Sequence, residues 1–364
     1  MTSLTFATGT RIITGLGALR ELPDEIGELG TRRLVAVLDR SLVEHGVLDV
    51  ISAADGELDT SRIVLVDPDP GVSDAERAAE QALAWNADSV LAVGGGSALC
   101  AAKAIAIRLT NPGPLLDYEG TGKVPNRPAP TIAVPTTAGS GGEVSNALVL
   151  HEPGRDREII IRGPGYEPTV AILDATLLAG LPRTPMLYAA IDALSHALEA
   201  LWTRRRTSFT DSLAEHAAQS IFADLPRALE DREPETLQRL LEASCAANLA
   251  CGNTGLGLVH ALSCAPSVGL PHGYQNGALL LHVGQFNRDA MDKRHQAYLE
   301  SAAGLFDAVA FPGKFEPNDL GPEAGAAMLA ASRSHVFRAN NVRDSADSDI
   351  STILAAAGVP PAVG

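Results

Sequence analysis

Apolar runs separated by helix-compatible stretches fill the first half of the chain. The runs are continuously apolar rather than alternating, which is typical of strands in a sheet buried on both faces and therefore of parallel βαβ units. The strands that we expect cover residues 33–39, 61–67, 89–95, 131–137 and 170–174, with a hairpin at 147–161. Helices are expected between them, at 73–85 and 98–108. The pattern predicts a Rossmann-like parallel sheet.

The periodicity changes beyond about Asp174. Long Ala- and Leu-rich stretches with apolar spacing close to 3.6 residues predict helices at 185–202, 209–230 and 235–251. From about Arg288 the pattern is less regular, and we expect surface helices and loops there. The fold class is therefore an α/β domain over residues 1–175, followed by an all-helical domain over residues 176–364.

Composition excludes several classes of partner. The 28 basic and 44 acidic residues give a net charge of −16, which repels nucleic-acid phosphates and anionic lipid. No apolar run reaches the roughly eighteen residues needed to cross a bilayer, and the N-terminus lacks the pattern of a secretory signal. The four cysteines include no CxxC pair, so we expect a reduced, cytoplasmic location.

Two glycine-rich loops follow predicted strands. Residues 94–97 read Gly-Gly-Gly-Ser and lead into a helix, whose free amides favour a phosphate; a tight turn is the alternative reading. Residues 135–144 offer hydroxyls and backbone amides for a nucleotide, with a flexible linker as the alternative. Asp39 ends another strand, where a carboxylate can bond ribose hydroxyls and repel a 2′-phosphate. The carboxylate of Asp39 therefore favours NAD over NADP.

A carboxylate and three histidines form a candidate metal site. Asp192 and His196 are four residues apart on a predicted helix, so both side chains share one face. His260 and His272 follow later in the chain. One carboxylate with imidazoles suits Fe²⁺ or Zn²⁺ better than Mg²⁺ or Ca²⁺. The alternative for each histidine alone is a surface or hydrogen-bonded core residue, and the spacing does not decide between them.

Long motifs carry a resemblance to the iron-containing (group III) alcohol dehydrogenase family, in order and separation, over about residues 5–290. They are Asp-Tyr-Glu-Gly at 117–120, Pro-Thr-Thr-Ala-Gly-Ser-Gly-Gly-Glu-Val at 135–144, Asp-Ala-Leu-Ser-His-Ala-Leu-Glu-Ala at 192–200, Gly-Leu-Gly-Leu-Val-His-Ala at 255–261 and Pro-His-Gly at 271–273. The resemblance implies a dinucleotide-binding domain and a helical metal-binding domain that also receives the substrate. It places at the catalytic metal positions Asp192, His196, His260 and His272. It places at the cofactor-contacting positions Asp39, Gly95, Gly96, Ser97, Thr136, Thr137 and Ser140.

The implied activity is reversible hydride transfer between NAD(H) and a small alcohol, aldehyde or ketone, with the metal as Lewis acid, in a homodimer. Two departures lie at family positions near the reaction centre: Cys100 replaces a typical aspartate, and Cys264 replaces a frequent histidine. Three alternatives stay open. They are a related maleylacetate reductase, a lyase resembling dehydroquinate synthase, and a non-catalytic relative that binds the cofactor.

Overall fold

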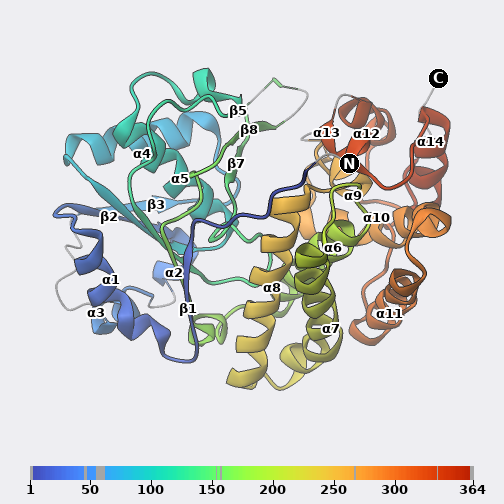
Figure 1. Cartoon of the computed structure of the whole chain (residues 1–364), viewed down its shortest axis with the longest axis horizontal. Coiled ribbons are helices and arrows are strands. Elements are labelled where there is room, and N and C mark those ends of the chain that lie inside the picture. The colour runs from blue at the N-terminus through green and yellow to red at the C-terminus, as the bar shows by residue number, and fades with distance from the viewer. Residues whose placement is uncertain are drawn as a thin grey trace. The chain divides into compact units, whose positions relative to one another are not determined.

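The computed structural model describes residues 3–44, 47–54, 62–152, 154–155, 158–265, 268–333 and 335–360. The chain divides into two compact units, one of Thr8–Pro182 and the other of Met1–Ala7 with Arg183–Gly364. The first unit contains the sheets and the second is mainly helical (Figure 1). The predicted fold class, a parallel α/β sheet followed by helices, is confirmed.

A parallel six-stranded sheet forms the framework of the first unit, in the order β1-β9-β6-β4-β2-β3. Its strands are β1 (Arg11–Thr14), β2 (Leu34–Asp39), β3 (Ile63–Val66), β4 (Ser89–Gly94), β6 (Thr131–Pro135) and β9 (Val170–Leu173). A smaller sheet has the order β5-β8-β7. Its strands are β5 (Gly120–Thr121), β7 (Ala147–Leu150) and β8 (Ile159–Arg162), of which β7 and β8 form the predicted hairpin. Strands β1 and β5 were not predicted.

Both faces of the large sheet are buried, as the continuous apolar strands require. Val35 and Val37 of β2 belong to a core cluster with Ala101 and Ile105 of α5. Leu38 of the same strand belongs to a second cluster on the other face, with residues of η1, α1 and α3. The helices of this unit are η1 (Ala18–Glu21), α1 (Leu22–Leu29), α2 (Arg40–Glu44), α3 (Val47–Ala54), α4 (Val72–Ala84), α5 (Gly96–Thr110), η2 (Leu115–Tyr118) and η3 (Ala175–Leu178).

The second unit is built around α6 (Arg183–Leu201), which packs against α7, α8 and α10. Figure 1 shows α6, α7 and α8 side by side. Most of the C-terminal half of α6 is buried, which explains why this helix is apolar on nearly every face. The other helices are α7 (Ser208–Glu230), α8 (Pro234–Thr254), α9 (Leu258–Ser263), α10 (His272–Asn287), η5 (Arg288–Ala290), α11 (Lys293–Val309), α12 (Ala324–Arg333), α13 (Val336–Asn340) and α14 (Asp347–Ala356).

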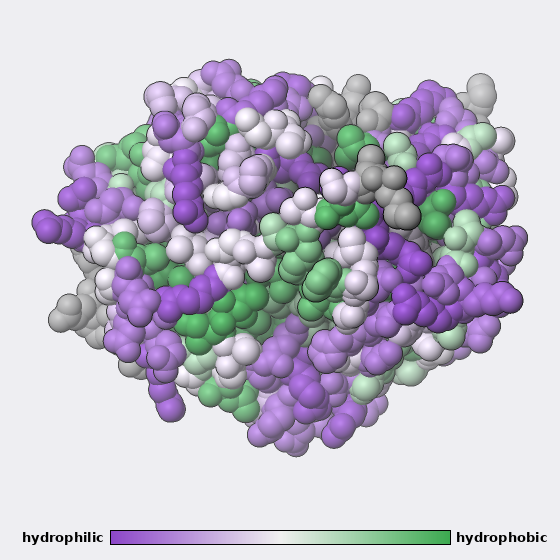
Figure 2. Space-filling view, viewed as in Figure 1, coloured by the Kyte–Doolittle hydropathy of each residue, from purple (hydrophilic) through white to green (hydrophobic). Residues whose placement is uncertain are grey.

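Polar residues cover much of the face of the molecule drawn in Figure 2, in keeping with the net charge of −16. Across the ranges that the structure describes, no helix combines the length and the apolar character that crossing a membrane requires.

Candidate active site

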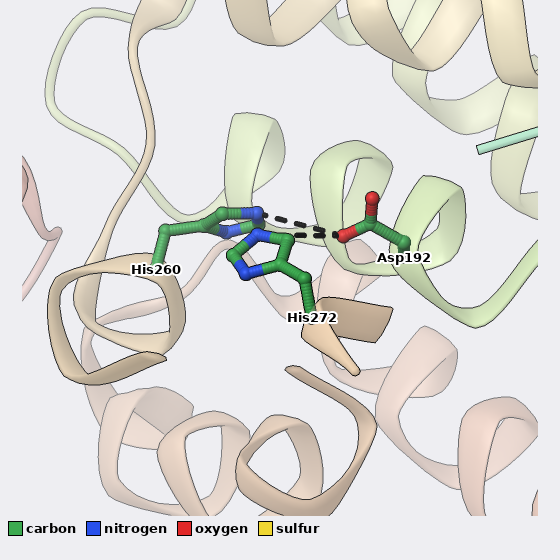
Figure 3. Close-up of side chains that lie close together, drawn as sticks. All are labelled: Asp192, His260 and His272. Atoms are coloured by element: carbon green, nitrogen blue, oxygen red, sulfur yellow. Dashed lines mark ion pairs between the residues drawn. The ribbon is translucent and has the colours of Figure 1, made fainter. Parts of the chain in front are cut away.

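Three of the four predicted metal ligands converge within the helical unit. Asp192 of α6, His260 of α9 and His272, the first residue of α10, each offer a ligand atom, and these atoms all lie within 4.8 Å of one another. The Nε2 atoms of His260 and His272 lie 3.8 and 3.9 Å from Asp192 Oδ1 (Figure 3). Asp192 and His260 are buried, whereas the side chain of His272 is 43% exposed. The group is therefore buried on one side and accessible beside His272.

The fourth predicted ligand, His196, stands beside this group. Its Nε2 atom lies 3.8 Å from Asp192 Oδ1, as expected for residues four apart on one helix face. The imidazole stacks on that of His260 with ring centroids 4.7 Å apart. The three imidazoles thus surround Oδ1 of Asp192, although the group with mutual spacing under 4.8 Å contains only Asp192, His260 and His272.

A buried glutamate that sequence reasoning missed orients His260. Glu199 Oε2 lies 2.6 Å from His260 Nδ1, and its two oxygens accept the backbone N–H groups of Val259 and His260. A carboxylate at Nδ1 fixes the tautomer with its proton on Nδ1, which leaves the Nε2 lone pair for a metal. Glu199 follows His196 by three residues, so their shared helix face was the available sequence signal.

Asn276 supports the same group from the first turns of α10. Its Nδ2 atom donates to Asp192 Oδ1 at 2.7 Å and lies 3.1 Å from His260 Nε2. The residue is fully buried and lies four positions after His272, on the same helix face. Sequence reasoning missed this residue too, because an asparagine inside a helix has no distinctive pattern.

Glycines allow the helices to approach closely enough to build the site. A Cβ atom on Gly273 would lie 2.0 Å from the carbonyl oxygen of Tyr188, and one on Gly277 would lie 2.6 Å from Ile191 Cγ2, both on α6. A Cβ atom on Gly257 would lie 2.9 Å from Glu199 Oε1. Only glycine therefore lets α10 and the start of α9 reach their positions beside α6.

The electrostatics of the group favour a cation. Burial alone would raise the pKa of Asp192, but the neighbouring imidazoles of His196 and His260 outweigh burial and hold that pKa well below its usual range. Burial lowers the pKa of His260, but its contacts with Asp192 and Glu199 more than compensate and raise it to about 9. Two carboxylates among the imidazoles thus attract positive charge, and the N/O donor set suits Fe²⁺ or Zn²⁺.

The predicted cofactor residues gather at one edge of the large sheet. Since β2, β4 and β6 are adjacent and parallel, their carboxyl ends share this edge. Strand β3 lies on one side of β2 and β4 on the other, so the chain reverses its direction of winding here. Such a switch point is where open α/β sheets bind nucleotides. Asp39 is the last residue of β2, the Gly94–Ser97 turn begins at the last residue of β4, and Thr136 directly follows β6.

The glycine turn after β4 is closely packed. Asp39 Oδ2 accepts the N–H of Gly95 at 2.7 Å, and a Cβ atom on Gly94 would lie 2.5 Å from that same oxygen. A Cβ atom on Gly96 would lie 3.1 Å from Ser140 Oγ. Because α5 begins at Gly96 and spans 15 residues, its N-terminal amides and dipole provide an anion site. Because these positions are glycines, the turn exposes backbone atoms, and a side chain at Gly94 or Gly96 would cover them.

The hydroxyl residues of this region play different parts. Ser97 Oγ accepts the backbone N–H of Asp69 at 3.0 Å, so this hydroxyl serves the local fold. Thr136 is buried and its N–H donates to the carbonyl oxygen of Gly94. Thr137 is half-buried and Ser140 is exposed. The structure therefore brings the predicted cofactor residues together, with Ser140 the most accessible of the hydroxyls.

The two departures from the expected pattern lie in different units. Cys100 is half-buried in the first two turns of α5, and Cys264 is buried directly after α9. Neither sulfur belongs to the group of ligand atoms formed by the described residues Asp192, His260 and His272. The contacts of Glu199 and Asn276 with that group do not involve these cysteines.

Family models match most of the chain. A model described as "Iron-containing alcohol dehydrogenase" matches residues 9–175, and one described as "Fe-containing alcohol dehydrogenase family, C-terminal" matches residues 186–310. The chain belongs to the iron-containing alcohol dehydrogenase family. The predicted family is confirmed, and with it the class of metal-containing alcohol dehydrogenases.

Individual relatives agree along nearly the whole length. The chain is 32% identical over 373 residues to the probable alcohol dehydrogenase EutG of Salmonella typhimurium, covering 97% of this chain and 94% of that protein. The NAD-dependent methanol dehydrogenase of Bacillus methanolicus is 32% identical over 309 residues, with 82% and 81% covered. The crystal structure of sulfoacetaldehyde reductase from Bifidobacterium kashiwanohense in complex with NAD+ superimposes with a TM-score of 0.88 at 28% identity, covering 98% of this chain and 99% of that one.

Proposed function

We propose that this chain is an NAD(H)-linked, metal-dependent oxidoreductase that interconverts a small alcohol and the corresponding aldehyde or ketone by hydride transfer. The observation that carries the proposal is the convergence of Asp192, His260 and His272, which lie far apart in the sequence, on one buried carboxylate oxygen. Residues 176–364 would supply the metal and substrate site, and residues 1–175 would bind the cofactor.

Asp192, His196, His260 and His272 would hold Fe²⁺ or Zn²⁺. The donor set fits such an ion, since it combines one carboxylate with imidazole nitrogens, one of which has its tautomer fixed by Glu199. When bound, the ion supplies Lewis acidity that lowers the pKa of an alcohol and polarises a carbonyl. The chain's own contribution includes holding His260 and Asp192 in place, through the hydrogen bonds of Glu199 and Asn276.

The cofactor would bind at the carboxyl edge of the large sheet. Its pyrophosphate fits the backbone-lined turn at Gly95 and Gly96, where the free amides of α5 favour an anion. Ser97, Thr136, Thr137 and Ser140 complete the set of proposed cofactor contacts. Two relatives support NAD as the cofactor: one is named as NAD-dependent, and one was solved with NAD+.

Asp39 favours NAD over NADP. Its carboxylate lies beside the glycine turn, where it would repel a 2′-phosphate and accept hydrogen bonds from the hydroxyl groups of a ribose. Burial raises the pKa of Asp39, while the hydrogen bond from Gly95 opposes that rise. The same carboxylate thus supports the turn and discriminates between the two cofactors.

The substrate class, assembly and location also belong to this proposal. Relatives include a methanol dehydrogenase, a 1-propanol dehydrogenase and a sulfoacetaldehyde reductase, so a small substrate fits the family. The family resemblance supports a homodimer. No disulfide joins the four cysteines, all of which lie in the described part of the chain, and this supports a reducing, cytoplasmic location. No nucleic-acid or membrane partner is proposed.

A substrate screen with metal analysis tests the function. Protein purified without oxygen should contain close to one Fe²⁺ or Zn²⁺ per chain and should form NADH from NAD with at least one short alcohol. Reduction confined to maleylacetate-type keto acids would favour a maleylacetate reductase. If the metal-loaded protein catalyses elimination from a phosphorylated sugar and forms no net NADH, a lyase is favoured. If the protein binds NAD but takes up no metal, a non-catalytic relative is favoured.

A further inference from the structure

The loop of residues 136–146, which follows β6, packs against one face of α5. Gly96, Leu99 and Lys103 are spaced by three and four residues, so they line up on this face. A Cβ atom on Gly96 would lie 3.1 Å from Ser140 Oγ, and one on Gly142 would lie 2.7 Å from Leu99 Cβ. The loop therefore lies along α5 from its first residue onward.

Lys103 binds the C-terminal end of this loop to α5. Its Nζ atom donates to the carbonyl oxygens of Ser145 and Ala147, at 2.7 and 2.9 Å. Ala147 is the first residue of β7, so the ammonium ties the end of the loop and the start of a strand to α5. The residue is only 3% exposed, although lysine is among the residues least often buried.

A second buried ionisable residue lies in the loop itself. Glu143 is 2% exposed, and among the described residues its Oε1 atom has no hydrogen-bond partner. Burial raises the pKa of Glu143 to about 7 and lowers the pKa of Lys103 to about 8. The charges that act on Lys103 come from Glu143, Cys100 and Glu167. Keeping an ammonium and a carboxyl group buried costs stability, so their retention calls for a structural or functional gain.

We propose that Lys103, together with Glu143, is a positioning residue for the cofactor. By holding the end of the loop on α5, Lys103 keeps Thr137 and Ser140 beside the N-terminal amides of that helix, in the shape that receives NAD. Glu143 supplies a negative charge that acts on the Lys103 ammonium. The inference rests on the proposed function, since it requires that NAD bind at this edge of the sheet. A loop fixed in advance costs less entropy on binding, so the pair should act on cofactor affinity rather than on the metal.

The test is the affinity of full-length, metal-loaded Lys103→Met for NAD+, measured by calorimetry at pH 8. We expect the Kd to rise by about tenfold or more, with KM for NAD+ rising in parallel and kcat at saturating NAD+ changing by less than about twofold. Metal content should stay at the wild-type level because the ligands lie in the other unit. Lys123→Met is the matched control, since Lys123 is exposed in the same unit.

A second substitution separates positioning from simple loss of stability. Adding Glu143→Gln to Lys103→Met removes a carboxyl group left buried without its cation, and should recover part of the NAD affinity. If Lys103→Met does not fold, the single variant Glu143→Gln tests the inference, and its Kd for NAD+ should rise by about threefold or more. An unchanged Kd in that variant then overturns the inference. A folded Lys103→Met that binds NAD+ like the wild type overturns the inference. Wild-type protein that does not bind NAD+ instead overturns the proposed function.

Discussion

Glu199→Gln tests how far the metal centre depends on an oriented imidazole. In the wild type, the carboxylate accepts hydrogen bonds from His260 Nδ1 and from the backbone amides of Val259 and His260. A glutamine of the same shape can accept at only one end, so its NH₂ group must face one of these buried donors. At least one of the three buried hydrogen bonds is lost, which costs about 1–3 kcal/mol of folding free energy.

The larger effect should be on metal affinity. Mutation of a carboxylate that hydrogen-bonds a ligating histidine typically weakens metal binding by about 10- to 100-fold, because the carboxylate both orients the imidazole and raises its basicity. We expect that range for Glu199→Gln, measured by titrating the metal-free protein with Co²⁺ or Zn²⁺ against a competing chelator. NAD binding should stay at the wild-type level, because Asp39 and the glycine turn lie in the other unit.

Glu215→Gln provides the matched control. Glu215 Oε1 lies 3.1 Å from Nε2 of the buried His295, so this substitution also disturbs a carboxylate–histidine pair in the helical unit. It should lower thermal stability and leave metal affinity unchanged. Equal metal affinities for Glu199→Gln and the wild type would refute the role given to Glu199. A similar loss of affinity in the control would show that stability alone explains the effect.

Three further predictions concern the cofactor turn, pH and the metal. Gly94→Ala places a Cβ atom 2.5 Å from Asp39 Oδ2, so the affinity for NAD should fall by about tenfold or more. Gly27→Ala is the control, because a Cβ atom there meets nothing within 4 Å, and it should leave the affinity for NAD unchanged. Burial raises the pKa of Glu143 to about 7, so its protonated form stabilises the fold below pH 4.5, and this stabilisation is lost as the pH rises through 7. The loss is about 3 kcal/mol, and Glu143→Gln should remove that slope from denaturant titrations. Chelation should lower the melting temperature and abolish turnover while NAD+ still binds; loss of NAD+ binding on chelation would contradict the assignment of separate sites.

The sequence predicts most of the sheet because continuous apolar strands have few alternatives. Strands β2, β4 and β6 lie close to their expected residues. The strand β1 was missed because it has only four residues, Arg11–Thr14, and owes its conformation to pairing with β9. The region after Arg288 forms α11, α12, α13 and α14, in keeping with the helices and loops expected there. Their bounds were not predicted, because helices interrupted by proline and glycine are set by tertiary packing rather than by local pattern.

The candidate metal site is predictable only in part. Helical spacing pairs Asp192 with His196, but nothing in the spacing brings His260 and His272 to them. Their convergence depends on the close approach of α10 to α6, which Gly273 permits because a Cβ atom there would meet the Tyr188 carbonyl oxygen. The family resemblance supplied the ligand set, while the roles of supporting side chains required the structure.

The two proposed sites are built in different ways, and this explains why Cys100 and Cys264 leave the metal group intact. The metal ligands are held by packed helices, with Glu199 and Asn276 bonded directly to ligand atoms, so the geometry depends on the backbones of α6, α9 and α10. The cofactor edge depends on loops after strands, which need the buried Lys103 and the Asp39–Gly95 hydrogen bond to hold their shape. A substitution that keeps these contacts should therefore change the substrate or the proton path before it changes metal or NAD binding.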